Sequence, residues 1–133
     1  VSENVSERAL REIYLRGFEI AVRKSQPWAV MTSYNLVNGV HTFASYDLCT
    51  KALRNEWGYQ GLVMTDWTAS EKNPGEHTAC ILAGNDLIMP GNPGAKKELA
   101  MALKNGQLKR SDLEVAAANV LNVIFSSNVW SLN

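Results

Sequence analysis

Cysteine is scarce in this chain, and neither sign of charge is in excess. Cys49 and Cys80 are the only two cysteines among 133 residues. Two are too few for a disulfide framework, and these two lie too far apart for a zinc knuckle, so we expect two buried thiols. Thirteen Lys and Arg residues balance 13 Asp and Glu residues, which leaves no net attraction toward nucleic acid or an anionic membrane. Because no apolar run approaches the roughly 20 residues that span a bilayer, we expect neither a nucleic-acid nor a membrane partner.

Several catalytic signatures are also missing. No glycine-rich phosphate loop precedes a helix, which argues against nucleotide chemistry. His41 and His77 stand apart from other metal ligands, and we interpret them as polar groups of a loop or a helix end. Ser33 has neither a nucleophile-elbow pattern nor a paired histidine. We therefore expect no metal, no cofactor and no serine hydrolase.

Apolar spacing alternates between the helical period and short extended runs. The extended runs predict strands at Ala29–Tyr34, at Gly61–Asp66 and at Asp86–Met89. Helices are expected around them, with apolar faces at Leu10, Ile13, Tyr14 and Ala21; at Leu48, Cys49, Ala52, Leu53 and Trp57; near His77 to Ala83; after Pro93; and at Leu113, Ala116, Ala117, Val120, Leu121 and Ile124. Capping signals are Asn4 with Glu7, Ser111 with Glu114, and the helix-ending glycines Gly58 and Gly84, while Asn38-Gly39 marks a polar loop.

Alternating helices and strands favour an α/β fold with a parallel sheet. Right-handed crossovers place the carboxyl ends of all its strands on one side, which is the side where α/β folds bind ligands. Tyr34, Asp66 and Met89 stand at these ends.

Asp66 follows an apolar strand directly and is itself followed by Trp67. A carboxylate there could serve as a nucleophile, a general base or a metal ligand, or only as the cap of the next helix. Trp67 fits a sugar platform or the core equally well, and Tyr34 could simply plug the sheet end with its hydroxyl in water. A carboxylate beside aromatic rings suits sugar chemistry, because such a group can attack or stabilise an oxocarbenium-like centre.

Three long motifs give a more specific indication. They are residues 30–35 (VMTSYN), 53–67 (LRNEWGYQGLVMTDW) and 83–91 (AGNDLIMPG), in this order. They closely resemble glycoside hydrolase family 3, in its β-glucosidase branch, and the resemblance covers roughly residues 5 to 125.

The resemblance implies that residues 1–125 form the C-terminal portion of a (β/α)8 barrel, followed by a tail at 126–133. The strands would be the sixth, seventh and eighth, so the fold class is a partial barrel of about three parallel strands with covering helices. Asp66 matches the family's catalytic nucleophile. Tyr34, Trp67 and Met31 match residues of the substrate-binding site.

The family's general acid/base is a Glu from a second domain, and Glu56, Glu71 and Glu76 do not match its motif. The resemblance thus predicts a fragment of a retaining β-glucosidase that hydrolyses terminal β-D-glucosyl residues of a glucoside or oligosaccharide. The chain would carry the nucleophile without the acid/base and would be inactive alone.

Three alternatives stay open: a non-catalytic barrel fragment that self-associates, a β-xylosidase-type member of the same family, and an independent α/β enzyme that reuses Asp66. The expected partners are the remainder of the enzyme or a second copy of the chain. The compartment, cytoplasmic or secreted, is left open by the sequence.

Overall fold

The computed structural model describes residues 2–128. Its helical segments are α1 (Glu7–Ala9), η1 (Leu10–Tyr14), α2 (Arg16–Ser25), η2 (Thr42–Ala44), η3 (Asp47–Glu56), α3 (Glu76–Ala83), α4 (Pro93–Lys104) and α5 (Arg110–Ser126). Its strands are β1 (Ser2–Glu3), β2 (Ala29–Met31), β3 (Leu36–Val37), β4 (Val40–His41) and β5 (Leu62–Met64). No helix in this range is both long and apolar enough to cross a membrane.

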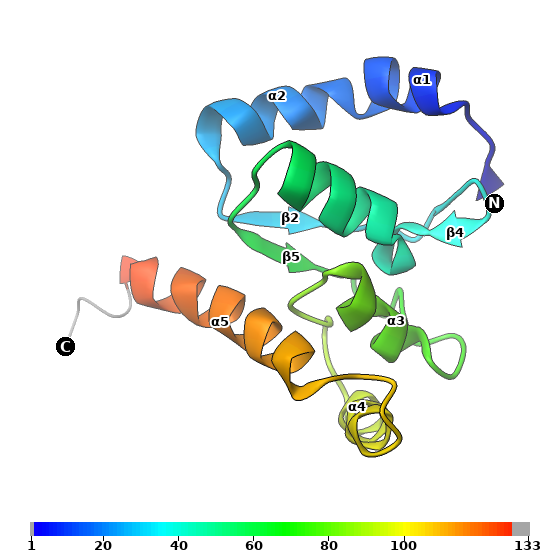
Figure 1. Cartoon of the computed structure of the whole chain (residues 1–133), viewed down its shortest axis with the longest axis vertical. Helices are drawn as coiled ribbons and strands as arrows, with labels where there is room; N and C mark the ends of the chain where they lie inside the picture. The colour runs from blue at the N-terminus through cyan, green and yellow to red at the C-terminus, as the bar shows by residue number, and fades with distance from the viewer. Residues whose placement is uncertain (1, 129–133) are drawn as a thin grey trace.

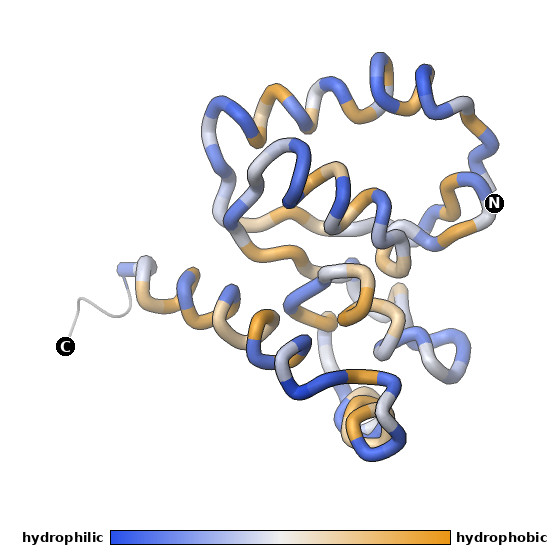
Figure 2. The backbone as a smooth tube through the Cα atoms, viewed as in Figure 1, coloured by the Kyte–Doolittle hydropathy of each residue, from blue (hydrophilic) through white to orange (hydrophobic). Residues whose placement is uncertain are grey.

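The centre of the fold is the parallel pair β2–β5, which pairs Ala29 with Leu62 and Met31 with Met64. In the view of Figure 1, α2 and η3 lie above this pair and α5 lies below it. Val63 is fully buried beside Val22 and Leu53, because alternate strand residues point toward the covering helices. β5 is visible as an apolar segment in the middle of the chain (Figure 2). The predicted α/β class and the parallel pairing are therefore confirmed.

The strand predicted at Asp86–Met89 is reduced to a single parallel bridge between Met64 and Leu87. The reason is that side chains replace part of the backbone ladder. The Val63 N–H donates to the Asp86 carboxylate at 2.8 Å, and the Met89 N–H donates to the Thr65 hydroxyl at 2.9 Å. Between them, the Thr65 N–H donates to the Leu87 carbonyl at 3.0 Å, and the Val63 carbonyl accepts the N–H groups of Asp86 and Leu87 at 2.8 and 3.2 Å.

A second small sheet, in the order β1-β3-β4, was not predicted. The loop at Asn38-Gly39 is its hairpin turn, and both residues have positive φ (50° and 83°), the combination that a type I′ turn requires. The Asn38 side chain also binds the backbone N–H and carbonyl of Val5, at 2.8 and 2.9 Å. This contact holds the N-terminal segment against the hairpin.

Several predicted boundaries need correction. The cap of α1 is Ser6 rather than Asn4, because the Ser6 hydroxyl accepts the Ala9 N–H. At the start of α5, the capping hydrogen bond runs from the Lys109 N–H to the Asp112 carboxylate, at 2.8 Å. The predicted capping pair was Ser111 with Glu114. The helix also continues to Ser126, one residue into the predicted tail, and residues 129–133 of that tail lie outside the described range.

The first predicted strand is shorter than expected, since β2 ends at Met31 instead of Tyr34. By contrast, Gly58 and Gly84 end their helices as predicted, with φ of 71° and 105°. Pro93 opens α4, also as expected, and Asn92 is its cap, which was not predicted.

The first helical stretch forms where predicted, but its apolar face is mostly uncovered. Ile13, Tyr14 and Phe18 are each at least 60% exposed. β2 also has a free edge, because β5 is its only partner among residues 2–128. The periodicity thus identifies the helix correctly without identifying what covers it.

Candidate functional site

The carboxyl ends of β2 and β5 bring the predicted site residues together. Tyr34 lies three residues beyond β2, and Asp66 lies two residues beyond β5. The Tyr34 hydroxyl donates a hydrogen bond to the Trp67 backbone carbonyl, which ties the two loops to each other. Because the strands are parallel, both loops leave the sheet at the same end, the carboxyl ends of the strands.

The Asp66 carboxylate is half-buried and lightly held. Its Oδ1 accepts the Trp67 N–H at 2.6 Å, and no other hydrogen bond to this carboxylate occurs within residues 2–128. Asp66 does not cap α3, which begins ten residues later, at Glu76. The interpretation of Asp66 as a helix cap is therefore wrong, and one carboxylate oxygen is left for another partner.

The aromatic residues of the site are open to solvent. Trp67 is 59% exposed, so its interpretation as a core residue is wrong, and Tyr34 is 44% exposed. The Lys72 ammonium lies 6.0 Å from the centre of the Tyr34 ring. Met31 is 58% exposed beside Met64, on the sheet face opposite Val30 and Val63.

The segment from Leu87 to Met89 braces the backbone on both sides of Asp66. On one side, Thr65 is fully buried, and its hydroxyl accepts the Met89 N–H at 2.9 Å. On the other side, the Thr68 N–H donates to the Met89 carbonyl at 3.0 Å. Thr68 has a positive φ of 59°, which turns the chain sharply after Trp67. The position of Asp66 is thus fixed by its neighbours, although its carboxylate is nearly free.

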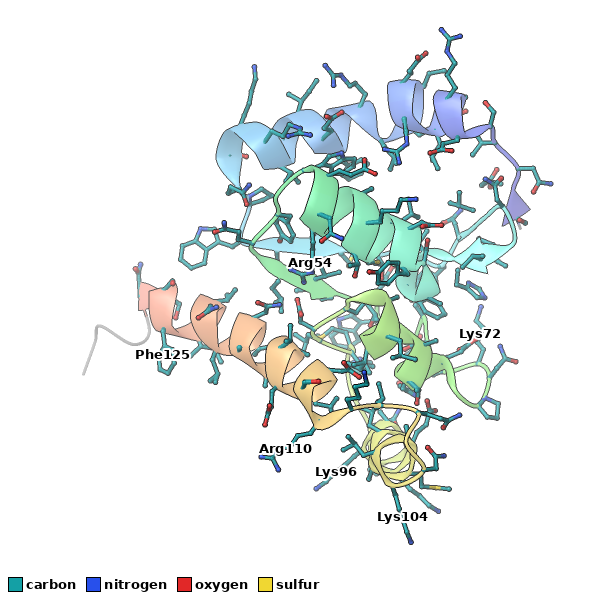
Figure 3. All side chains as sticks on the ribbon, viewed as in Figure 1. Arg54, Lys72, Lys96, Lys104, Arg110 and Phe125 are labelled. Atoms are coloured by element: carbon teal, nitrogen blue, oxygen red, sulfur yellow. The ribbon has the colours of Figure 1, made fainter. Side chains whose placement is uncertain are left out.

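Asp86 is a structural residue of this site that sequence reasoning missed. Its side chain is only 3% exposed, and it accepts hydrogen bonds from Arg54 (2.6 Å), Val63 N–H (2.8 Å) and Asn119 (2.8 Å). Arg54 extends from η3 toward β5, where it also reaches the carbonyls of Gly61 and Gly84 (Figure 3). The sequence did contain a signal for this role. Asp86 is a charged residue at the start of an apolar run, and a charge that is buried there requires a partner.

The three glutamates set aside in the sequence are engaged elsewhere. Glu56 pairs with Arg11 at 2.6 Å, Glu71 accepts from Asn92 at 2.7 Å, and Glu76 accepts from Asn73 at 2.6 Å. His77 lies in the first turn of α3, a helix end as predicted, and is buried against Glu98 at 3.0 Å. Between residues 2 and 128, no group of three or more His, Cys, Asp or Glu side chains is arranged to hold a metal ion.

Comparisons with known proteins show which family this chain resembles. Residues 1–123 match the family model described as the glycosyl hydrolase family 3 N terminal domain. A β-glucosidase of Ruminococcus albus is 46% identical over 95% of this chain and 14% of its own length. An exo-α-(1→6)-L-arabinopyranosidase of Bifidobacterium breve is 38% identical over 93% of this chain and 16% of its own length.

Solved structures give the same result. The structure of β-glucosidase 3B from Thermotoga neapolitana in complex with glycerol superimposes with a TM-score of 0.86 and 48% identity. The match covers 94% of this chain and 18% of that one. The chain therefore spans less than a fifth of the length of each of these three proteins.

Proposed function

The chain belongs to glycoside hydrolase family 3, and from this premise we propose that it supplies the catalytic nucleophile, Asp66, of a retaining β-glucosidase. The observation that carries the proposal is the placement of Asp66. It is a half-buried carboxylate at a strand end, with a braced backbone and a single hydrogen bond among the described residues. Exposed aromatic rings stand beside it, ready to contact a sugar.

In the proposed reaction, an Asp66 oxygen attacks the anomeric carbon while the bond to the aglycone oxygen breaks. A general acid protonates the departing oxygen, and a covalent glycosyl ester of Asp66 remains. Water, deprotonated by the same group, then attacks the anomeric carbon and releases both the sugar and the free carboxylate. Retaining enzymes place these two carboxyl groups about 5 to 5.5 Å apart.

The neighbouring residues have distinct proposed roles. The Trp67 N–H orients Asp66 by holding Oδ1. The Trp67 ring packs against the apolar face of the sugar, and Tyr34 borders the anomeric centre from the adjacent loop. Met31 lines the sugar site from β2.

The acid/base is proposed to come from outside this chain. Without it, leaving-group protonation is lost, which typically costs about 10²–10⁴ in rate. We therefore expect the isolated chain to be inactive and the complete enzyme to require the rest of the barrel. The uncovered face of Ile13, Tyr14 and Phe18 and the free edge of β2 support docking of further barrel elements there.

The proposed substrate carries a terminal β-D-glucosyl residue. The similarity to an arabinopyranosidase makes the pentose sugars the alternative to test. Relative kcat/KM values for the 4-nitrophenyl β-glucoside, β-xyloside and α-L-arabinopyranoside would assign the sugar. A preference for a pentoside would contradict the glucosidase proposal and leave the role of Asp66 intact.

The role of Asp66 is tested in the complete enzyme with the substitution Asp66→Ala. Turnover should be abolished while the circular dichroism spectrum is unchanged, and azide should restore turnover of an activated aryl β-glucoside by replacing the missing nucleophile. The inverted α-glucosyl azide is the expected product. The matched control, Glu71→Ala, removes a carboxylate from the same loop and should retain most activity. Substantial hydrolysis by Asp66→Ala without azide would refute the proposal.

A further inference from the structure

A small hollow lies at the end of the sheet opposite Asp66. It holds about 210 Å³ and is bounded by the turn before β2, the turn before β5 and the last turns of α5. Trp28 and Gly61 immediately precede the two strands, and the Leu62 N–H donates to the Trp28 carbonyl at 2.9 Å. We call this feature the Trp28 hollow.

No charged side chain lines the hollow within the described residues. Its walls carry four side-chain amides, from Gln26, Gln60, Asn119 and Asn122. The Trp28 side chain is 55% exposed at its rim. Such a lining has no opposite charge to pair with an ionic ligand. It offers hydrogen bonds and one apolar ring to a neutral ligand that is rich in hydroxyl groups.

Several of these amide groups remain available. Within residues 2–128, the Gln60 and Asn122 side chains make no hydrogen bond. Asn119 donates its N–H to Asp86 at 2.8 Å, which leaves its carbonyl oxygen free in the same range. The side chains of Gln60 and Asn122 and the carbonyl oxygen of Asn119 therefore leave donors and acceptors at the wall of the hollow.

Hydrogen bonds hold the backbone turn that carries Trp28. Gln26 fixes the turn, because it donates to the Gly58 carbonyl and accepts the Gln60 N–H, both at 3.2 Å. Gly61 permits this close approach, since a Cβ there would lie 2.7 Å from the carbonyl oxygens of Pro27 and Trp28. An indole on such a turn has only two side-chain torsions to order when it binds a ligand.

We propose that the Trp28 hollow is a second carbohydrate-binding site, which holds a neutral glucan chain away from the catalytic centre. A pyranose ring stacks on the indole of Trp28, and Gln60 and Asn122 hydrogen-bond its hydroxyl groups. The site itself does not depend on Asp66. It rests on the proposed function only in the choice of a β-glucan as its ligand.

The test measures binding of laminari-oligosaccharides to the complete enzyme in an Asp66→Ala background by calorimetry. We expect two binding sites. Trp28→Ala should weaken one of them by about tenfold or more, as expected for the loss of an aromatic platform. Trp28→Tyr should retain most of that binding. A double substitution, Gln60→Ala with Asn122→Ala, should also weaken this site without a folding defect, because neither side chain has a partner among the described residues.

Controls separate this site from the catalytic one. Tyr46 is as exposed as Trp28 (55%) and does not line the hollow, so Tyr46→Ala should leave both sites unchanged. In the active enzyme, Trp28→Ala should lower kcat/KM on a polymeric β-glucan and leave hydrolysis of a small aryl glucoside unaltered. A single site in the Asp66→Ala protein, unchanged binding in Trp28→Ala, or a Trp28→Tyr variant as weak as Trp28→Ala would overturn the proposal. Failure of aryl glucoside hydrolysis by the native enzyme would instead refute the proposed function.

Discussion

The carboxylate of Asp86 accepts the backbone N–H of Val63 at 2.8 Å, in the place where a neighbouring strand would present a carbonyl oxygen. The same carboxylate binds Arg54 of η3 and Asn119 of α5. One buried charge thus connects the strand that leads to Asp66 with two helices. Its position explains why the contact at Leu87 is a single bridge rather than a longer ladder.

Asp86→Ala should strongly destabilise the protein. The substitution leaves Arg54, whose side chain is 18% exposed, without its partner, and loss of one member of a buried ion pair costs about 3–5 kcal/mol. The denaturation midpoint of the complete enzyme should fall accordingly. Asp47→Ala removes an acid that is 81% exposed and pairs with Lys51 at 3.7 Å, so this control should change the midpoint little. Equal effects of the two substitutions would show that Asp86 does not have the role described.

Glu98→Ala should loosen the start of α3. Gly75 at the N-cap offers no side chain, and Glu98 of α4 accepts the Thr78 N–H at 2.8 Å and its hydroxyl at 2.9 Å instead. Loss of a helix cap costs about 0.5–2 kcal/mol. Faster hydrogen exchange at the first amides of α3 is the expected signal, with Glu114→Ala, at an exposed position of α5, as control. Unchanged exchange in α3 would exclude the cap.

Glu98 should also make stability depend on acid pH. Burial alone would raise the pKa of its carboxyl, but hydrogen bonds from His77 and Thr78 outweigh burial and hold the pKa below its usual range. The ionised form is thus favoured by folding, so its contribution is present above the unfolded pKa of about 4.3. That contribution should be lost as pH falls through the lower folded value. Glu98→Gln should flatten this part of the stability curve, and an unchanged curve would contradict the assignment.

Cys49 and Cys80 are free and buried, as the sequence predicted. Burial raises the pKa of Cys49 to about 11 and that of Cys80 to about 12. Folding therefore favours the neutral thiols, and the stability they contribute is complete below the unfolded pKa of about 8.5 and declines as pH rises toward the folded values. At pH 8, both should react with iodoacetamide far more slowly in the native protein than in urea. Rapid native labelling of either thiol would be inconsistent with this burial.

The sequence revealed most of the elements because their signals are local. Apolar periodicity located the helices, and Gly58 and Gly84 marked helix ends through their positive φ. The sequence did not reveal that the side chains of Asp86 and Thr65 take the place of backbone carbonyls in the sheet. Each of these side chains accepts an N–H from a residue more than 20 positions away, and no local pattern encodes such a contact. The pairing of β1 with β3 is also non-local, and strands of two residues have no periodicity to detect.

The sequence predicted the local features of the site but not the contacts between distant segments. A strand end followed by Asp66 and Trp67 is a local pattern, and the exposure of both aromatic residues agrees with it. The contact between Tyr34 and Trp67 depends on the parallel register of β2 and β5, which no single motif encodes. The Trp28 hollow likewise joins three segments, and its amides carry no signal in the sequence until the fold brings them together.

The most direct test of the central claim is to trap the covalent intermediate in the complete enzyme with an activated 2-deoxy-2-fluoro-β-glucoside. Mass spectrometry of the digested enzyme should find the fluoroglucosyl group on the peptide that contains Asp66, and fragmentation should place it on that carboxylate. A label on any other carboxylate, or inactivation with no label, would contradict the assignment of Asp66 as the nucleophile.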